Sequence, residues 1–179
     1  MNSNPSNTLL LFGATGDLAR RMLLPSLYAL HVDGLIAKDL RIFGTARSSL
    51  SDAEYRKMIS DALHEFLPEE RKDAAAIEAF LERIFYQPLD ASQTDGFADL
   101  AKKLGDISAG MSIFLSTAPF LFEPTIKGLQ SAGLAGDNVR IGLEKPLGND
   151  FASSTKINNA VAAAFPEDRI FRIDPYLGK

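Results

Sequence analysis

Short apolar runs alternate with stretches of helical periodicity along this chain. The run at residues 8–12 (TLLLF) is continuous and ends at Gly13, which is typical of a strand buried on both faces of a sheet. Strands are expected at residues 8–12, 40–45, 84–87, 112–116, 139–143 and 170–173. Each of these except the last is followed by at least one helical stretch. The alternation predicts an α/β fold, a doubly wound and mostly parallel sheet with helices on both faces.

The helical stretches between the strands carry their own start and stop signals. Helices are expected at residues 17–31, 52–66, 68–81, 92–104, 120–131 and 152–164. Pro25 interrupts the first of them and should kink or restart it, because proline has no backbone N–H. Ser51 and Glu54 form a capping-box pattern that opens the second.

Composition restricts the classes of function. The 179 residues are enough for one domain with a sizeable core. Cysteine is absent and only His31 and His64 could contribute to a histidine cage, so no metal site is expected. The net charge of −4 argues against a nucleic-acid partner. No apolar run reaches the ~18 residues of a membrane span, and a cytoplasmic location without a membrane partner is expected.

A glycine loop at residues 13–19 (GATGDLA) separates the first expected strand from the first helix. It has the form G-x-x-G-x-x-A, one residue shorter than the common dinucleotide fingerprint. Gly13 would allow a tight turn, Gly16 a close approach to a pyrophosphate, and free N–H groups at the helix start would hold the phosphates. The pattern predicts a Rossmann-like site whose cofactor-binding residues are Gly13, Ala14, Thr15, Gly16, Asp17, Leu18 and Ala19. The alternative is an ordinary glycine-rich turn.

Arg47 follows the second expected strand, where NAD-selective folds place an acidic residue on the adenosine ribose. No Asp or Glu occurs here before Asp52. An arginine beside Ser48 would instead bind a 2′-phosphate bidentately, because the guanidinium fork matches phosphate geometry. The position favours NADP over NAD, with Arg47 and Ser48 as cofactor-binding residues. A solvated surface arginine is the alternative.

Four segments, in order along the chain, resemble the glucose-6-phosphate dehydrogenase family: residues 13–30 (GATGDLARRMLLPSLYAL), 44–47 (GTAR), 144–148 (EKPLG) and 171–179 (FRIDPYLGK). The resemblance covers only the family's N-terminal coenzyme domain. It implies hydride transfer from C1 of glucose 6-phosphate to NADP+, in the pentose phosphate pathway. It also implies that residues 1–179 are one NADP-binding domain, without the family's C-terminal substrate and dimerisation domain. The family is homo-oligomeric.

The resemblance implies roles for individual residues. Asp174 would orient the catalytic histidine, and Lys145 would lie between coenzyme and sugar as a catalytic residue. The implied ligands of the sugar phosphate are Lys145, Tyr176 and Lys179, and the cofactor-binding set also includes Ala118, Lys145 and Pro146. Without the family match, Lys145 would be interpreted as a surface lysine, Asp174 as a turn residue and Tyr176 as a packing residue.

Two positions depart from the family pattern. Pro175 stands where the family has a phosphate-binding histidine, and Met22 where it has a lysine that touches the substrate. Each change removes a donor, and a hydrogen bond to a charged group contributes about 1.5–3 kcal/mol. Weaker phosphate binding is therefore expected, and a divergent relative with an altered sugar substrate is one alternative function.

The chain has no residue placed to act as the general base that oxidation of a hydroxyl requires. The family's base is a histidine of the second domain. His31 falls near the end of the first helix and His64 in a helix beyond the second strand, so neither is placed to substitute. We expect the chain alone to bind NADP without turnover. The same residues are also compatible with a non-catalytic nucleotide-binding or interaction domain, or with an unrelated Rossmann-type reductase.

Overall fold

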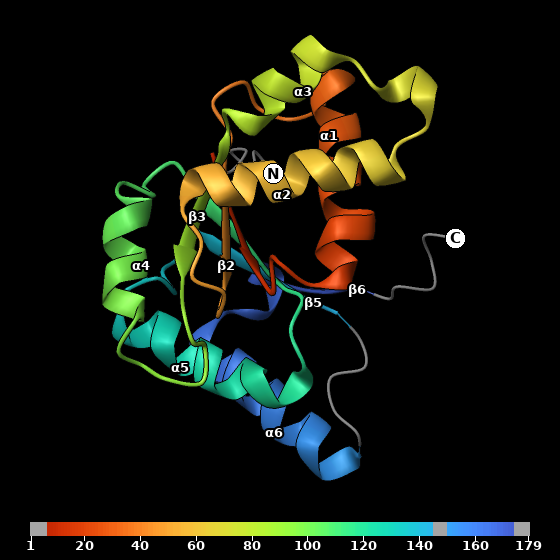
Figure 1. Cartoon of the computed structure of the whole chain (residues 1–179). Helices are drawn as coiled ribbons and strands as arrows, with labels where there is room; N and C mark the ends of the chain where they lie inside the picture. Colours follow the sequence, from red (N-terminus) through yellow and green to blue (C-terminus); the bar gives the residue numbers. More distant parts are fainter. Residues whose placement is uncertain (1–6, 145–149, 174–179) are drawn as a thin grey trace.

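The computed structural model describes residues 7–144 and 150–173, which contain one six-stranded sheet (Figure 1). Its strands are β1 (Thr8–Phe12), β2 (Arg41–Ala46), β3 (Ile84–Pro88), β4 (Met111–Leu115), β5 (Val139–Glu144) and β6 (Ile170–Ile173). They lie in the order β3-β2-β1-β4-β5-β6, and every neighbouring pair is parallel. The expected α/β class and the doubly wound parallel sheet are confirmed.

The strand order reverses at β1. The chain runs outward from β1 to β2 and β3, then crosses back to β4 on the other side of β1. Phe12, the last residue of β1, lies opposite Thr45 of β2 and Leu115 of β4. The loops after these three strands therefore leave the sheet side by side at its carboxyl edge. In open α/β sheets this edge, at the point of reversal, is where ligands bind.

Two groups of helices cover the sheet (Figure 1). One face carries α1 (Leu24–Val32), α2 (Asp52–Phe66) and α3 (Ala74–Leu81), and the other carries α4 (Phe97–Leu104), α5 (Phe122–Ser131) and α6 (Phe151–Ala164). Leu10 and Phe12 of β1 pack with the α4–α6 group, and Leu11 packs with the α1–α3 group. Burial on both faces explains the uninterrupted apolar runs of the strands.

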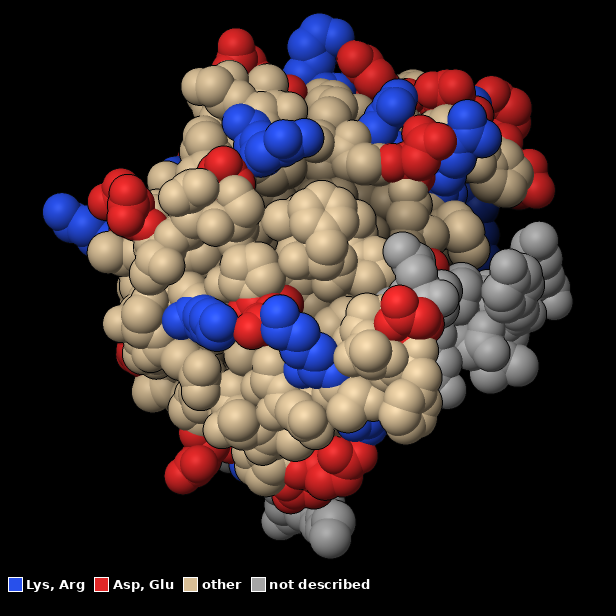
Figure 2. All heavy atoms as spheres, turned by 90° about the horizontal axis from the view of Figure 1, so that it is seen from below, with Lys and Arg blue, Asp and Glu red and all other residues tan. Residues whose placement is uncertain are grey.

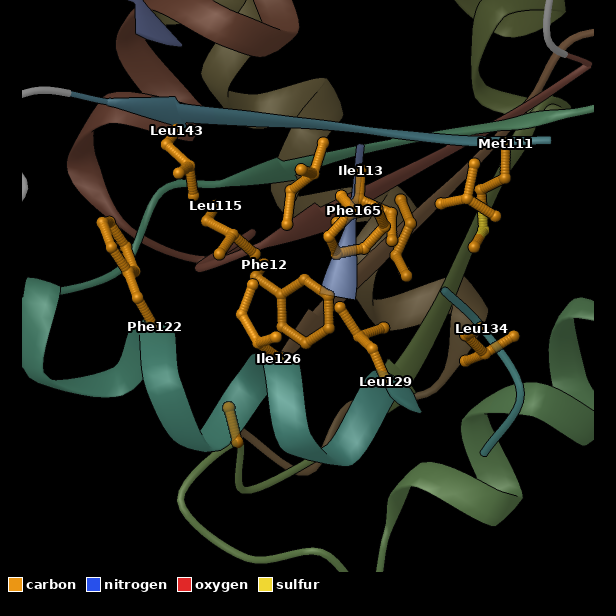
Figure 3. Close-up of a cluster of buried hydrophobic side chains, with 14 of the residues drawn as sticks. Phe12, Met111, Ile113, Leu115, Phe122, Ile126, Leu129, Leu134, Leu143 and Phe165 are labelled. Carbon is orange, nitrogen blue, oxygen red and sulfur yellow. The ribbon is translucent and has the colours of Figure 1, made fainter. Parts of the chain in front are cut away.

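Figure 3 shows the core beneath the face that α5 covers. Ile126 and Leu129 of α5 point toward the sheet, where Phe12, Ile113 and Leu115 meet them. Full burial of an apolar side chain of this size contributes about 1.5–3 kcal/mol. This layer holds β1 against β4, and with them the loops at the point of strand reversal.

The first helical stretch begins at Asp17 as expected, but it is not one regular α-helix. Residues Ala19–Leu23 form a π-helical turn, and α1 restarts at Leu24 with Pro25 in its first turn. Pro25 has no N–H to continue the hydrogen-bond ladder of the preceding turn, which explains the restart.

Two other helices are shorter than the sequence pattern predicts. Pro68 is followed only by a 3-10 turn, Glu69–Arg71, and α3 starts separately with Asp73 as its N-cap. The expectation of a helix from residue 92 is wrong in its first turns, because α4 begins at Phe97. Ser92 instead donates its backbone N–H and its hydroxyl to the Asp90 carboxylate, a local turn that competes with helix formation.

The face seen in Figure 2 lies below the view of Figure 1, on the side of α5 and α6. Uncharged residues cover most of it, and basic and acidic side chains are interspersed on it. Glu123 of α5 pairs with Lys127 and with Lys156 of α6, at 3.0 Å in each case, which links the two helices. Among the described residues, no helix combines the length and the apolar character needed to cross a membrane.

Candidate cofactor site

A cavity of about 320 Å³ opens at the carboxyl edge of the sheet where the strand order reverses. Loops after four strands build it: β1, β2, β3 and β4. Its lining residues are Phe12, Gly13, Thr15, Gly16, Thr45, Ala46, Arg47, Leu89, Asp90, Ala91, Ser116, Thr117, Ala118, Phe120 and Leu121. Five residues expected to bind a cofactor are thus brought together here, namely Gly13, Thr15, Gly16, Arg47 and Ala118.

Gly13 lies where the β1 and β4 loops pack closely together. Its φ is +75°, in the left-handed region that favours glycine. A Cβ built on Gly13 would overlap the carbonyl group of Ser116. The N–H groups of Gly13 and Ala14 both donate to the Thr45 carbonyl, at 3.1 and 3.2 Å, which joins the β1 loop to β2.

The loop after β1 leaves backbone donors free at the start of a helix. Gly16 donates its N–H to the Gly13 carbonyl at 3.0 Å. The N–H groups of Thr15, Asp17 and Leu18 have no hydrogen-bond partner in the described part of the chain. Unpaired N–H groups at a helix N-terminus, assisted by the helix dipole, favour binding of an anion.

Arg47 lies immediately beyond the end of β2, and its side chain is exposed to solvent. Within residues 7–144 and 150–173, no carboxylate pairs with it inside 4.0 Å. Its nearest acidic neighbour along the cavity wall is Asp90, after β3. Hydrogen bonds from Ser92 are the main cause that lowers the pKa of Asp90, and the charge of Arg47 adds to it. Arg47 therefore keeps its donors available for a ligand.

Thr117 supplies a polar group that the sequence analysis did not single out. Its Oγ1 is buried and has no hydrogen-bond partner among the described residues, although the residue lines the cavity. A buried hydroxyl without a partner is costly, so Thr117 contributes an unsatisfied polar group next to the cavity. This orphan hydroxyl, the free N–H groups and the unpaired arginine fit a phosphorylated nucleotide.

The other expected cofactor residues lie around the cavity rather than in its wall. Ala14 and Ala19 are fully buried behind the loop, and Leu18 is half-buried. Asp17 is exposed, where its carboxylate faces Arg21 one helical turn later. Ser48 is exposed on the β2 loop. Their part in binding stays a prediction.

Five expected site residues, Lys145, Pro146, Asp174, Tyr176 and Lys179, lie outside the described residues. The strands that precede them are described. β5 ends at Glu144 and β6 at Ile173, and because the sheet is parallel both ends lie at its carboxyl edge. Met22 is described and is 43% exposed in the turn before α1, so an apolar side chain is open to solvent there. In the part of the chain that the structure describes, no group of three or more His, Asp or Glu side chains is arranged to hold a metal ion.

Two buried tyrosines that do not line the cavity contact the β1 and β2 loops. The Tyr55 hydroxyl of α2 donates to the Ala14 carbonyl at 3.1 Å. The Tyr86 hydroxyl of β3 lies 2.7 Å from the Ser48 carbonyl and 3.0 Å from the Ala46 carbonyl. Burial raises the pKa of both tyrosines, so both hydroxyls keep their protons at neutral pH and act as donors.

The raised pKa of Tyr55 predicts a loss of stability in alkali. Above pH ~10 the unfolded chain releases the phenolic proton while the folded chain retains it. The unfolded state then binds fewer protons, so the free energy of unfolding falls as the pH rises, with a slope from Tyr55 that approaches about 1.4 kcal/mol per pH unit. Urea unfolding between about pH 9 and pH 11 should show a shallower slope for Tyr55→Phe than for the unmodified chain. Equal slopes would contradict this account.

Comparison with known proteins agrees with the geometry. Residues 10–179 match the family described as glucose-6-phosphate dehydrogenase, NAD binding domain. The chain is 49% identical over 177 residues to the glucose-6-phosphate 1-dehydrogenase of Zymomonas mobilis subsp. mobilis, an alignment that covers 99% of this chain and 36% of that protein. It is 38% identical to the enzyme of Mycolicibacterium smegmatis, covering 100% of this chain and 38% of that protein. The chain thus spans little more than a third of the length of these relatives.

Solved structures of the same family share the fold. The crystal structure of glucose-6-phosphate 1-dehydrogenase from Mycobacterium avium superposes with a TM-score of 0.87 and 31% identity, over 98% of this chain and 37% of that one. A glucose-6-phosphate dehydrogenase in complex with its substrate glucose-6-phosphate gives a TM-score of 0.86 and 30% identity, over 100% of this chain and 38% of that one. With the cavity at the strand reversal and the match over residues 10–179, the chain belongs to the NAD binding domain family of the glucose-6-phosphate dehydrogenases.

Proposed function

We propose that this chain is the coenzyme domain of an NADP-dependent glucose-6-phosphate dehydrogenase and that residues 1–179 bind NADP as one domain. One observation carries the preference for NADP. Arg47 is exposed, makes no ion pair within the described residues, and lines the same cavity as the free N–H groups of the β1 loop. A guanidinium at this place suits the 2′-phosphate that distinguishes NADP from NAD.

Each part of the cavity wall has a role in holding the cofactor. The N–H groups of Thr15, Asp17 and Leu18 would bind the diphosphate, and Gly16 would leave room for it beside the backbone. Arg47 and Ser48 would hold the 2′-phosphate, and the Thr117 hydroxyl would find its missing partner on the ligand. When bound, NADP+ supplies the acceptor for a hydride.

The sugar side of the site is proposed from the family resemblance. Glucose-6-phosphate is the substrate of the structural neighbour solved with it. We propose the same substrate class here, with Lys145, Tyr176 and Lys179 as ligands of the sugar phosphate and Asp174 as the residue that orients a catalytic histidine. The dehydrogenase to which this domain belongs would assemble as a homo-oligomer in the cytoplasm.

Neither histidine of the chain is placed to take the hydroxyl proton. His31 lies in the last turn of α1, where its ring packs 5.6 Å from the ring of Phe80. His64 lies in the last turn of α2, with Nδ1 2.7 Å from the Ser60 carbonyl. Neither residue lines the cavity. The chain alone is therefore expected to bind NADP+ without oxidising the sugar.

Unfolding in urea with and without nucleotide tests this proposal. NADP+ at about 100 times its Kd should raise the free energy of unfolding by about 2.7 kcal/mol, because it binds only the folded state. NAD+ at the same concentration should raise it less. Adding glucose 6-phosphate together with NADP+ should produce no absorbance of NADPH. No stabilisation by NADP+ would refute the cofactor site, and sustained NADPH formation would show that the chain holds its own base.

A further inference from the structure

We propose that Tyr55 and Tyr86 are positioning residues with separate roles. Tyr55 fixes the loop that receives the diphosphate, and Tyr86 fixes the backbone that carries Arg47, so that Tyr86 sets the preference for NADP over NAD. This inference rests on the proposed function of the cavity. Neither tyrosine lines the cavity, so each acts through the loop that it holds.

The Tyr55 side chain extends from α2 to the β1 loop and passes directly beside Gly44 of β2. Its side chain is fully buried, and its hydroxyl donates to the carbonyl of Ala14, which is also fully buried. A Cβ built on Gly44 of β2 would lie 2.6 Å from the ring carbon Cζ of Tyr55. Only a residue without a side chain at position 44 therefore lets the ring pass. Ala14 directly precedes Thr15, whose N–H is one of the free donors of the loop.

Tyr86 holds the β2 loop on both sides of Arg47. Its hydroxyl lies within hydrogen-bond distance of the carbonyls of Ala46 and Ser48, the two neighbours of Arg47 in the chain. A phenol has one proton, so the two carbonyls share a single donor. The backbone N–H of Tyr86 donates to the Asp52 carboxylate at 2.7 Å, which fixes the tyrosine itself at the start of α2.

The two rings also pack against each other. Their centroids are 4.7 Å apart with an angle of 37° between the ring planes. Phenylalanine at either position would keep this ring contact and remove only the hydroxyl. Phenylalanine at position 55 would leave the buried Ala14 carbonyl without this donor, at the desolvation cost of an unpaired polar group. Phenylalanine at position 86 would remove the hydroxyl that ties the β2 loop to β3, while the Ala46 and Ser48 carbonyls keep the N–H groups of Leu89 and Leu50 as donors.

The separate roles of the two tyrosines predict different effects on the Kd values for NADP+ and NAD+, two cofactors that share a diphosphate. Tyr86→Phe should raise the Kd for NADP+ by about 3- to 10-fold and leave the Kd for NAD+ within about 2-fold, because only NADP+ uses the Arg47 loop. Tyr55→Phe should raise both Kd values by a similar factor and leave their ratio unchanged, because both cofactors use the β1 loop. Gly44→Ala, which displaces the Tyr55 ring, should reproduce the second result.

Calorimetric titration of each variant with NADP+ and NAD+, at one fixed salt concentration, tests the assignment. Tyr28→Phe is the matched control. Tyr28 is fully buried in α1 and donates to the Arg71 carbonyl at 3.0 Å, and it does not line the cavity. Tyr28→Phe should lower the free energy of unfolding in urea, as Tyr55→Phe and Tyr86→Phe do, and should leave both Kd values unchanged.

A purely structural role for the tyrosines would give another pattern. All three variants would then lose stability without changing the ratio of the two Kd values, and that result would overturn the assignment. An unmodified chain that binds both cofactors equally would refute the NADP preference of the proposed function. It would also refute the proposal that Tyr86 sets this preference. The unmodified chain is titrated first, so the two failures are told apart.

Discussion

Replacement of Gly13 by alanine is expected to lower the free energy of unfolding by about 2–5 kcal/mol, a large part of the ~5–15 kcal/mol that a natural domain has. Two costs add. A left-handed backbone at φ +75° costs an alanine roughly 1–2 kcal/mol. Its Cβ would also overlap the Ser116 carbonyl, and overpacking of this kind costs about 1–3 kcal/mol. Urea unfolding at constant temperature measures the loss.

Gly34→Ala separates these two costs. Gly34 has a φ of +70°, but a Cβ there meets nothing within 4 Å. This control should lose only the conformational part, roughly 1–2 kcal/mol. Equal losses in the two variants would show that the contact between the β1 and β4 loops is not tight, and the account of Gly13 would be wrong.

Arg47→Ala is expected to raise the Kd for NADP+ by about 10- to 100-fold, because hydrogen bonds to a charged group contribute about 1.5–3 kcal/mol. The Kd for NAD+, which has no 2′-phosphate, should change by less than about 2-fold. The Kd of Arg47→Lys for NADP+ should lie between the values for the unmodified chain and for Arg47→Ala, since lysine keeps the charge and loses the bidentate geometry. Equilibrium titration with both cofactors measures these changes.

Lys38→Ala is the matched control for the loss of positive charge. Lys38 is exposed in the segment before β2, whereas Arg47 follows the opposite end of the same strand. Its replacement should leave both Kd values unchanged. If Lys38→Ala weakens NADP+ binding as much as Arg47→Ala does, then net charge and not the cavity determines the preference.

Local patterns were sufficient to predict the strands and the glycine loop. The apolar run of β1 ends at Gly13, and this residue has the tight, left-handed conformation that its position at a strand end suggested. Arg47 was found from its place after β2 alone, and the structure puts both residues on one cavity. Signals of this kind depend on neighbours along the chain, which a sequence displays directly.

The parts that the sequence analysis missed depend on contacts between distant segments. Thr117 and Asp90 join the cavity because β4 and β3 end at the same edge of the sheet as β1 and β2. The hydroxyl of Tyr55 meets Ala14 across 41 positions of sequence, and nothing near either residue signals that contact. A loop motif can thus be recognised in a sequence, while the side chains that support it from behind cannot.

The most direct test is calorimetric titration of the unmodified chain with NADP+ and, separately, with NAD+ at one fixed salt concentration. The account predicts that NADP+ binds at least about 10-fold more tightly than NAD+, because the 2′-phosphate meets Arg47 in addition to the diphosphate contacts that both cofactors make. Equal affinity for the two cofactors, or tighter binding of NAD+, would contradict it.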